Sequence, residues 1–234
     1  MATIKFLCTT ALKSSLDELL STFEHEVEPV YGPSAQLTKR LADGETADAV
    51  VLTGPGFDDM AKLGKVTPAS RLAIARSATM LAVKQGTPRP DISTIEKFKQ
   101  AMLNAKSVAF SGPGAGASGA HITKVLEQLG IAEAMKPRIV LGPGGPAGLI
   151  GNYLVRGEAE IGIQQDSELM SVPGVDIVGP LPAEIGLVTE FVFAVHTGAR
   201  DTNAAKALGQ FLRSPASLAV MKAKGLTTAR PASS

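Results

Sequence analysis

The chain has 234 residues, 44% hydrophobic and 19% charged, which is enough apolar sequence for a core in one large or two small lobes. Its 23 lysines and arginines against 22 acidic residues leave a net charge of +1, so the totals give no electrostatic footprint for nucleic acid or an anionic membrane. The single Cys8 excludes an internal disulfide, and no cysteine–histidine spacing indicates a metal site, so neither a metal nor another cofactor is expected.

Strands and helices alternate in the first part of the chain. Apolar runs predict strands at residues 4–10, 27–32 and 47–53. Leucines at helical spacing predict a helix over residues 12–23, and Ser34 is placed to cap a second helix. This order favours a parallel sheet covered by helices, because parallel neighbours need a crossover.

The same order returns after a break. Residues 79–86 predict a strand, and the prolines of residues 87–91 interrupt regular structure. Further strands are expected at residues 107–112, 138–142, 159–165 and 189–196, with helices ending at Gly130, over 147–156, and around Leu208 and Leu218. The repeated plan predicts two lobes, residues 1–80 with 190–234 and residues 81–189, and a frayed tail at residues 229–234.

The glycine-rich loop "SGPGAGASGAH", residues 111–121, follows one of these strands. It lacks the Gly-Lys-Ser/Thr ending of a P-loop. Gly114, Gly116 and Gly119 match the GxGxxG spacing, but the acidic residue expected about 20 positions on is Glu133, which falls near a helix end rather than a strand end. Free backbone N–H groups at a helix start, with Ser118 beside them, instead favour a carboxylate or an oxyanion.

The first predicted lobe offers similar groups. Thr9 and Thr10 follow the first strand, and Ser34 and Ala35 open the second helix. In open α/β sheets ligands lie beyond the carboxyl ends of the strands, so we expect these groups to line one cleft between the lobes. Ser34 and Ser118 also suit a purely structural role as helix caps.

Four blocks carry a resemblance to a known family: "FLCTTALKSSLDELLSTFE", "YGPSAQLTKRLADGETADAVVL", "LVRGEAEIGIQQDSEL" and "LGQFLRSPASLAVMKAKGL". In order and spacing they resemble the molybdate-binding, type II periplasmic solute-binding proteins over most of residues 3–226. The resemblance implies an α/β fold of two lobes, each a mainly parallel sheet flanked by helices, joined by two hinge strands near 79–86 and 189–196. It also implies that hydroxyls and backbone amides trap an oxyanion between the lobes.

Two positions depart from the family pattern. The family's first-turn serine falls on Ala11, and its cleft tyrosine falls on Gln164, while Ser34 is kept. The loss of two hydroxyl donors argues against molybdate. Because an amide both donates and accepts hydrogen bonds, Gln164 and Gln165 suit an organic acid better than a bare oxyanion.

The GASG block, "QQDSEL" and "PLP" are similar to a branch of this superfamily that includes aconitate isomerase, which moves a double bond in an unsaturated tricarboxylate. Such chemistry needs a proton acceptor with a pKa near neutrality and donors for the developing charge. His121 is the first candidate acid or base, and Glu190 is a reserve base. The expected substrate contacts are Thr9, Thr10, Ser34, Ala35, Ala117, Ser118, Gly119, Gly145, Pro146, Gln164 and Gln165.

Two functions therefore stay open. The first is a receptor for a small oxyanion or carboxylate, with an ABC importer as its partner if the chain is exported. The second is a cofactor-free isomerase of an unsaturated di- or tricarboxylic acid, and His121 as a plain surface residue is the alternative to that role. No apolar leader follows Met1, which predicts no signal peptide and no membrane insertion: a cytoplasmic protein, or a periplasmic one if a signal has been removed.

Overall fold

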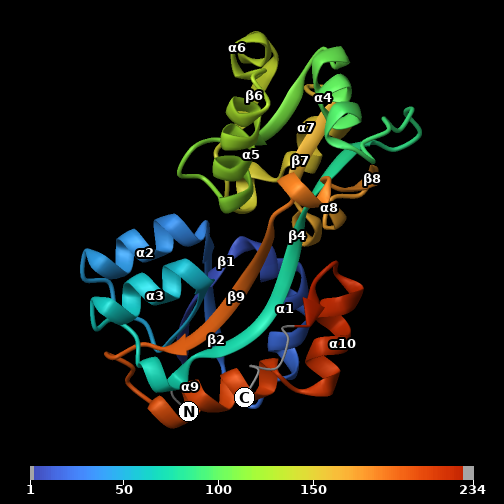
Figure 1. The fold of residues 1–234 in the computed structure, drawn as a ribbon. Coiled ribbons are helices and arrows are strands. Elements are labelled where there is room, and N and C mark those ends of the chain that lie inside the picture. Colours follow the sequence, from blue (N-terminus) through green and yellow to red (C-terminus); the bar gives the residue numbers. More distant parts are fainter. Residues whose placement is uncertain (1–2, 229–234) are drawn as a thin grey trace. The chain divides into compact units, whose positions relative to one another are not determined.

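Strand β4, Leu72–Lys84, runs from one folding unit of the protein into the other (Figure 1). The computed structural model describes residues 3–228. Unit 1 comprises the residues up to Ser77 and those from Thr189 on, and unit 2 comprises Ala78–Val188. The expected fraying of residues 229–234 lies outside the described residues.

The sheet of unit 1 has the order β2-β1-β3-β9-β4, with β10 paired to β4. Strands β1, β2 and β3 are parallel, so their carboxyl ends lie at one edge, and β9 is antiparallel to β3. The strands are β1 Ile4–Thr9, β2 Val27–Gly32, β3 Ala49–Thr53, β9 Val188–Val195 and β10 Thr227–Thr228. The helices are α1 Lys13–Leu19, α2 Ser34–Ala42, α3 Gly54–Lys62, α9 Thr202–Leu212 and α10 Pro215–Ala223.

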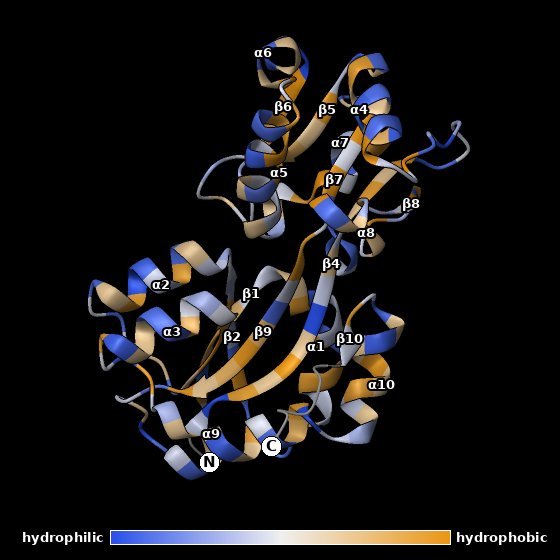
Figure 2. Ribbon diagram, viewed as in Figure 1, coloured by the Kyte–Doolittle hydropathy of each residue, from blue (hydrophilic) through white to orange (hydrophobic). Residues whose placement is uncertain are grey.

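Alternating side chains bury both faces of this sheet. Phe6 and Phe193 pack on one face with Leu12, Leu16 and Leu208, beneath α1, α9 and α10. The other face packs against α2 and α3 through Leu37, Leu41, Phe57 and Met60. Figure 2 shows the result as strands that are largely hydrophobic beside helices of mixed character. A sheet buried on both faces needs such nearly continuous apolar strands.

The sheet of unit 2 has the order β4-β7-β5-β6, with β8 on the other side of β4. Strands β5, β6 and β7 are parallel, and β4 is antiparallel to β7. The strands are β5 Val108–Ser111, β6 Ile139–Gly142, β7 Ile161–Gln165 and β8 Val175–Pro180. The helices are α4 Ile95–Asn104, α5 Ala117–Gln128, α6 Ala132–Met135, α7 Ile150–Val155 and α8 Asp166–Met170.

Two cores also hold unit 2 together. Phe98 of α4, Phe110 of β5 and Ile122 of α5 belong to the larger one. Ile150 and Leu154 of α7 pack with Leu169 of α8 on the opposite face. The proline-rich residues 87–91 lie inside this unit.

Several elements differ from the sequence expectations. Strand β4 begins at Leu72, seven residues before the expected start at residue 79. Its first half is hard to recognise in the sequence because the polar residues Arg76 and Ser77 interrupt the apolar run. One helix is expected over residues 147–156. The structure instead has a 3-10 turn, Pro146–Gly148, followed by the shorter helix α7, Ile150–Val155. Helices α3, α4, α6 and α8 and strands β8 and β10 are not among the elements expected from the sequence. Among the described residues, no helix is long and apolar enough to span a membrane.

Candidate functional site

The carboxyl edge of the unit 2 sheet collects the loops that the sequence singles out. Strands β5, β6 and β7 end at Ser111, Gly142 and Gln165, and their parallel pairing brings these ends to one edge. Ligands of α/β sheets bind at this edge. The glycine-rich loop, the segment 143–148 and the start of α8 all leave the sheet here.

Helix α5 begins at Ala117 and presents unsatisfied N–H groups. Its N-cap is Gly116, which has no side chain to cap the helix. The N–H of Ala120 donates to the carbonyl of Gly116 at 3.2 Å, so the N–H groups of Ala117, Ser118 and Gly119 precede the first intrahelical bond. Together with the helix dipole, these three donors favour a bound anion.

Two glycines fix this helix start in place. A Cβ atom on Gly119 would lie 1.8 Å from the carbonyl oxygen of Ser111, so the helix packs directly on the end of β5. Gly144 has a φ of +72°, and its Cβ would lie 1.9 Å from the carbonyl oxygen of Ala115. The loops after β5 and β6 are therefore in backbone contact, which the GASG and GPGG stretches permit.

Gly145 and Pro146 leave β6 at the same edge. Gly145 is buried with a φ of +70°, and Pro146 opens the 3-10 turn and is exposed. Both residues follow Gly144, whose backbone contacts Ala115 in the loop before α5. Their ligand contacts stay a prediction.

Gln164 has a structural partner that the sequence does not reveal. The side chain is 1% exposed, and its Oε1 accepts a hydrogen bond of 2.7 Å from the N–H of Ile150. The carbonyl oxygen thereby satisfies the start of α7, which leaves the NH2 group for other contacts. Gln165 points to the opposite face of β7, because successive side chains of a strand alternate.

Two carboxyl groups at the start of α8, Asp166 and Glu168, are not among the site residues expected from the sequence. Burial raises the pKa of Asp166. Glu168 keeps part of its surface exposed but is densely surrounded by protein, and this burial raises its pKa to about 7, although the N–H of Gln165 donates to the carboxyl group and acts to lower it. The signal in the sequence is a glutamate three residues after the N-cap, as in a capping box.

His121 lies on α5, and its orientation is fixed by a hydrogen bond. Its Nε2 is 2.7 Å from the carbonyl oxygen of Ile185. A carbonyl only accepts, so Nε2 carries the hydrogen, and Nδ1 of the neutral ring is the acceptor. In this tautomer the lone pair of Nδ1 is available to a hydrogen-bond donor.

The carboxyl edge of unit 1 holds a second set of polar groups. Thr9 ends β1, and the hydroxyl of Thr10 is buried without a hydrogen-bond partner in the described structure. The expected capping role of Ser34 is wrong: Pro33 is the N-cap, and Ser34 Oγ instead accepts from the N–H of Thr53 at 3.1 Å. Ala35 follows in the first turn of α2.

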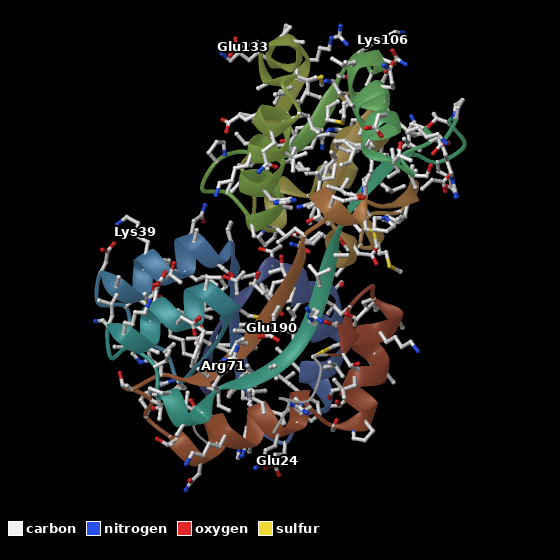
Figure 3. The ribbon with its side chains drawn as sticks, viewed as in Figure 1. Glu24, Lys39, Arg71, Lys106, Glu133 and Glu190 are labelled. Carbon is white, nitrogen blue, oxygen red and sulfur yellow. The ribbon has the colours of Figure 1, made fainter. Side chains whose placement is uncertain are left out.

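Glu190 lies on β9 of unit 1 and forms an ion pair with Arg71. Its Oε2 is 2.9 Å from a guanidinium nitrogen of Arg71, and Figure 3 labels both side chains. The carboxylate is about one third exposed. A base role for Glu190 therefore requires it to act beside a paired arginine, and that role stays a prediction.

A pocket of about 750 Å³ lies at the other edge of unit 2. It is lined by residues at the amino ends of β5 and β7, among them Ala105 and Ile161, and by Lys97 and Asp91. None of the predicted site residues lines it. Among residues 3–228, no group of histidine, cysteine, aspartate and glutamate side chains has the arrangement of a metal site.

Comparisons with known proteins identify relatives of this chain. The model of a family described as bacterial extracellular solute-binding protein matches residues 4–227. An aconitate isomerase from Pseudomonas sp. is 37% identical over 202 residues, which are 85% of this chain and 74% of that protein.

Two solved structures share the fold. The periplasmic molybdate-binding protein of Azotobacter vinelandii superposes with a TM-score of 0.79 at 18% identity, covering 97% of this chain and 100% of that one. The sulfate-binding protein SubI of Mycobacterium tuberculosis gives 0.76 at 18% identity, with coverages of 99% and 88%. The expected α/β fold of the type II periplasmic binding proteins is confirmed.

Proposed function

Because this chain belongs to the bacterial extracellular solute-binding protein family, we propose that it binds a small anion, a carboxylate or an oxyanion. The family match also confirms the resemblance read from the sequence. Docking on an ABC importer stays a prediction.

The start of α5 is the observation that carries this proposal. Three N–H donors at a helix start are held against the end of β5 by Gly119, where a Cβ would collide with the backbone. Such preorganised donors bind an anion without the entropic cost of ordering a loop. The balance of 23 basic and 22 acidic residues supports local recognition of this kind over attraction by the whole molecule.

Proton NMR of candidate solutes tests the proposal. We expect the proton signals of at least one acid among cis-aconitate, trans-aconitate and tricarballylate to broaden when the protein is added. We expect an excess of a second acid that competes for the site to sharpen them again. Parallel competition with molybdate and sulfate shows whether inorganic oxyanions occupy the same site. Sharp signals for every acid, with no molybdate or sulfate binding by calorimetry, would contradict the proposal.

Isomerisation of an unsaturated tricarboxylate is the second candidate function. The 37% identity to an aconitate isomerase favours it, and two groups of unit 2 are candidates for the acid or base: His121, whose Nδ1 is an acceptor, and Glu168, whose pKa is raised by burial to about 7. In this reaction a base removes a proton beside one carboxylate, the double bond shifts, and a proton is returned to the other allylic carbon. Backbone donors would hold the developing charge.

The same NMR samples, prepared in D2O, test this second candidate. Conversion of one aconitate isomer into the other, with deuterium entering the allylic position, is the expected result for an isomerase. His121→Ala should then abolish turnover while largely preserving broadening of the substrate signals. Loss of turnover in Glu168→Gln alone would assign the proton transfer to Glu168, and binding without conversion in the parent protein would reject the isomerase.

A further inference from the structure

Arg76 is the arginine of residues 3–228 whose guanidinium has neither a carboxylate nor a carbonyl partner. Its Nε atom is fully buried and makes no hydrogen bond. The other described arginines all have partners: Arg40 with Glu45, Arg71 with Glu190, Arg89 with Asp176, Arg138 with Leu103, Arg156 with Glu158, Arg200 with Asp48 and Arg213 with Ala73.

A buried guanidinium Nε–H without an acceptor is unfavourable. Burial of a charged donor without a partner costs more free energy than burial of a neutral one. Buried polar groups are satisfied in nearly all native structures, so an exception needs an explanation. A bound anionic ligand would supply the missing acceptor.

Strand register places Arg76 at the carboxyl edge of unit 1. Ser70 Oγ accepts from the N–H of Val195 at 2.8 Å, and Val195 is paired with Ala49, the first residue of β3. Strand β4 neighbours β9 in the sheet. From the level of Ala49, β4 therefore runs alongside β9 and parallel to β3, toward the carboxyl end of β3. Arg76, six residues after Ser70, therefore reaches the level where β3 ends at Thr53.

Side-chain alternation places Arg76 on the face that α1 covers. Arg71 lies over the ring of Phe57 on the face covered by α2 and α3, so the even-numbered residues that follow it point to the other face. Leu72 and Ile74 pack there in the cluster that contains Leu12 and Leu16, which the small side chain of Ala75 also joins. Thr10, which precedes α1 at this edge, carries another buried hydroxyl without a partner. The carboxyl edge of the unit 1 sheet thus holds a buried guanidinium Nε and a buried hydroxyl that both lack a hydrogen-bond partner.

We propose that Arg76 binds a carboxylate of the solute, so that the ligand is an organic acid with two or three carboxylates. The proposal rests on the anion-binding function above and assigns its ligand class. The planar guanidinium fork matches a carboxylate in a bidentate pair. In the order β1-β3-β9-β4, the strand of Arg76 lies three spacings, or about 14 Å, from the strand before Thr10, a span that suits an extended acid better than one tetrahedral oxyanion.

Calorimetric titration of tricarballylate into the parent protein and three variants tests this assignment. We expect Arg76→Gln to weaken binding by about 30-fold or more, because it truncates one partner of a buried charge pair. Arg76→Lys, which keeps the charge without the fork, should fall between Arg76→Gln and the parent. Arg156→Gln, a loss of charge at the exposed pair with Glu158, should bind within about twofold of the parent.

Deleting a carboxylate from the ligand identifies the partner. Glutarate lacks the central carboxylate of tricarballylate, and methylsuccinate lacks a terminal one. For one of these two acids, Arg76→Gln should cause little further loss of affinity, because the carboxylate that Arg76 contacts is already missing. Thermal unfolding of each variant checks that the fold is retained.

Three outcomes would overturn the assignment, and they differ from failure of the proposed function. Tricarballylate affinity in Arg76→Gln within threefold of the parent would remove Arg76 from the site. An equal loss of affinity for all three acids in Arg76→Gln would show that the substitution disturbs the structure of the site rather than removing one carboxylate contact. Binding of molybdate or sulfate but of no organic acid would reject the ligand class and leave anion binding intact, whereas binding of neither class would reject the proposed function itself.

Discussion

Glu168 shows how one residue can serve the fold at the expense of stability at neutral pH. Its carboxyl group accepts from the N–H of Gln165 at the start of α8, while burial raises its pKa to about 7. In the unfolded chain the same carboxyl ionises near pH 4.5, so the folded state retains the proton longer as the pH rises. Stability is therefore lost between about pH 4.5 and 7, and the penalty is complete above this window.

Glu168→Gln should remove this pH dependence. The amide oxygen still accepts from Gln165, but nothing ionises. We expect the variant to match the parent near pH 4 and to exceed its free energy of unfolding by roughly 2–3 kcal/mol at pH 8. Urea unfolding at several pH values measures this difference. A difference that stays constant from pH 4 to pH 8 would contradict the raised pKa.

For Gln164 and Ser34, the place in the fold could be predicted from the sequence, but the hydrogen-bond partners could not. Gln164 and Ser34 lie at the expected sheet edges. The amide oxygen of Gln164 accepts from the N–H of Ile150, and the hydroxyl oxygen of Ser34 accepts from the N–H of Thr53. Those partners are 14 and 19 residues away in the chain. Spacing along one sequence cannot reveal such tertiary hydrogen bonds. Arg76 was overlooked because its position depends on the register of β4.

At the scale of elements, the contact between α5 and β5 depends on the absence of one side chain. Gly119 brings the first turn of α5 against Ser111, and every Cβ at this position would require the helix or the strand to move. Gly112 lies in the same loop, but its Cβ would meet the nearest atom only at 3.7 Å. The two glycines thus differ in one physical respect, the room for a methyl group.

Gly119→Ala should therefore destabilise the protein and weaken anion binding. We expect a loss of about 2 kcal/mol or more in the free energy of unfolding, as for overpacked core positions. Gly112→Ala is the matched control and should change it by less than about 1 kcal/mol. Urea unfolding and solute titration of both variants provide the measurement, and equal stabilities for the two would refute the close-packing account.

Elements with a strong apolar period were predictable, and those started by turn residues were not. Strands β1, β3, β5 and β7 contain mainly apolar runs, so the expectations hold. Helix α3 opens with Gly-Pro-Gly, typical of a loop, yet Thr53 accepts from the N–H of Gly56 and proline suits a first helical turn. Helix α8 has only five residues, too few for a helical period to show.

At the scale of the whole molecule, recognition of an anion must come from local groups. The net charge of +1 provides almost no long-range attraction, so the rate of ligand association should depend only weakly on salt. Each unit has its own set of donors at the carboxyl edge of its sheet: the start of α5 in unit 2, and Thr10 with Arg76 in unit 1. The central claim is that these edges, and no other surface, bind the solute.

Amide NMR of the labelled protein during titration with tricarballylate tests this claim most directly. We predict that the largest shifts occur at the amides of Ala117, Ser118 and Gly119 and, in unit 1, at Thr10 and Arg76. Shifts confined to the residues lining the 750 Å³ pocket, such as Gln100 and Asn104, would contradict the account, because that pocket lies at the opposite edge of the unit 2 sheet.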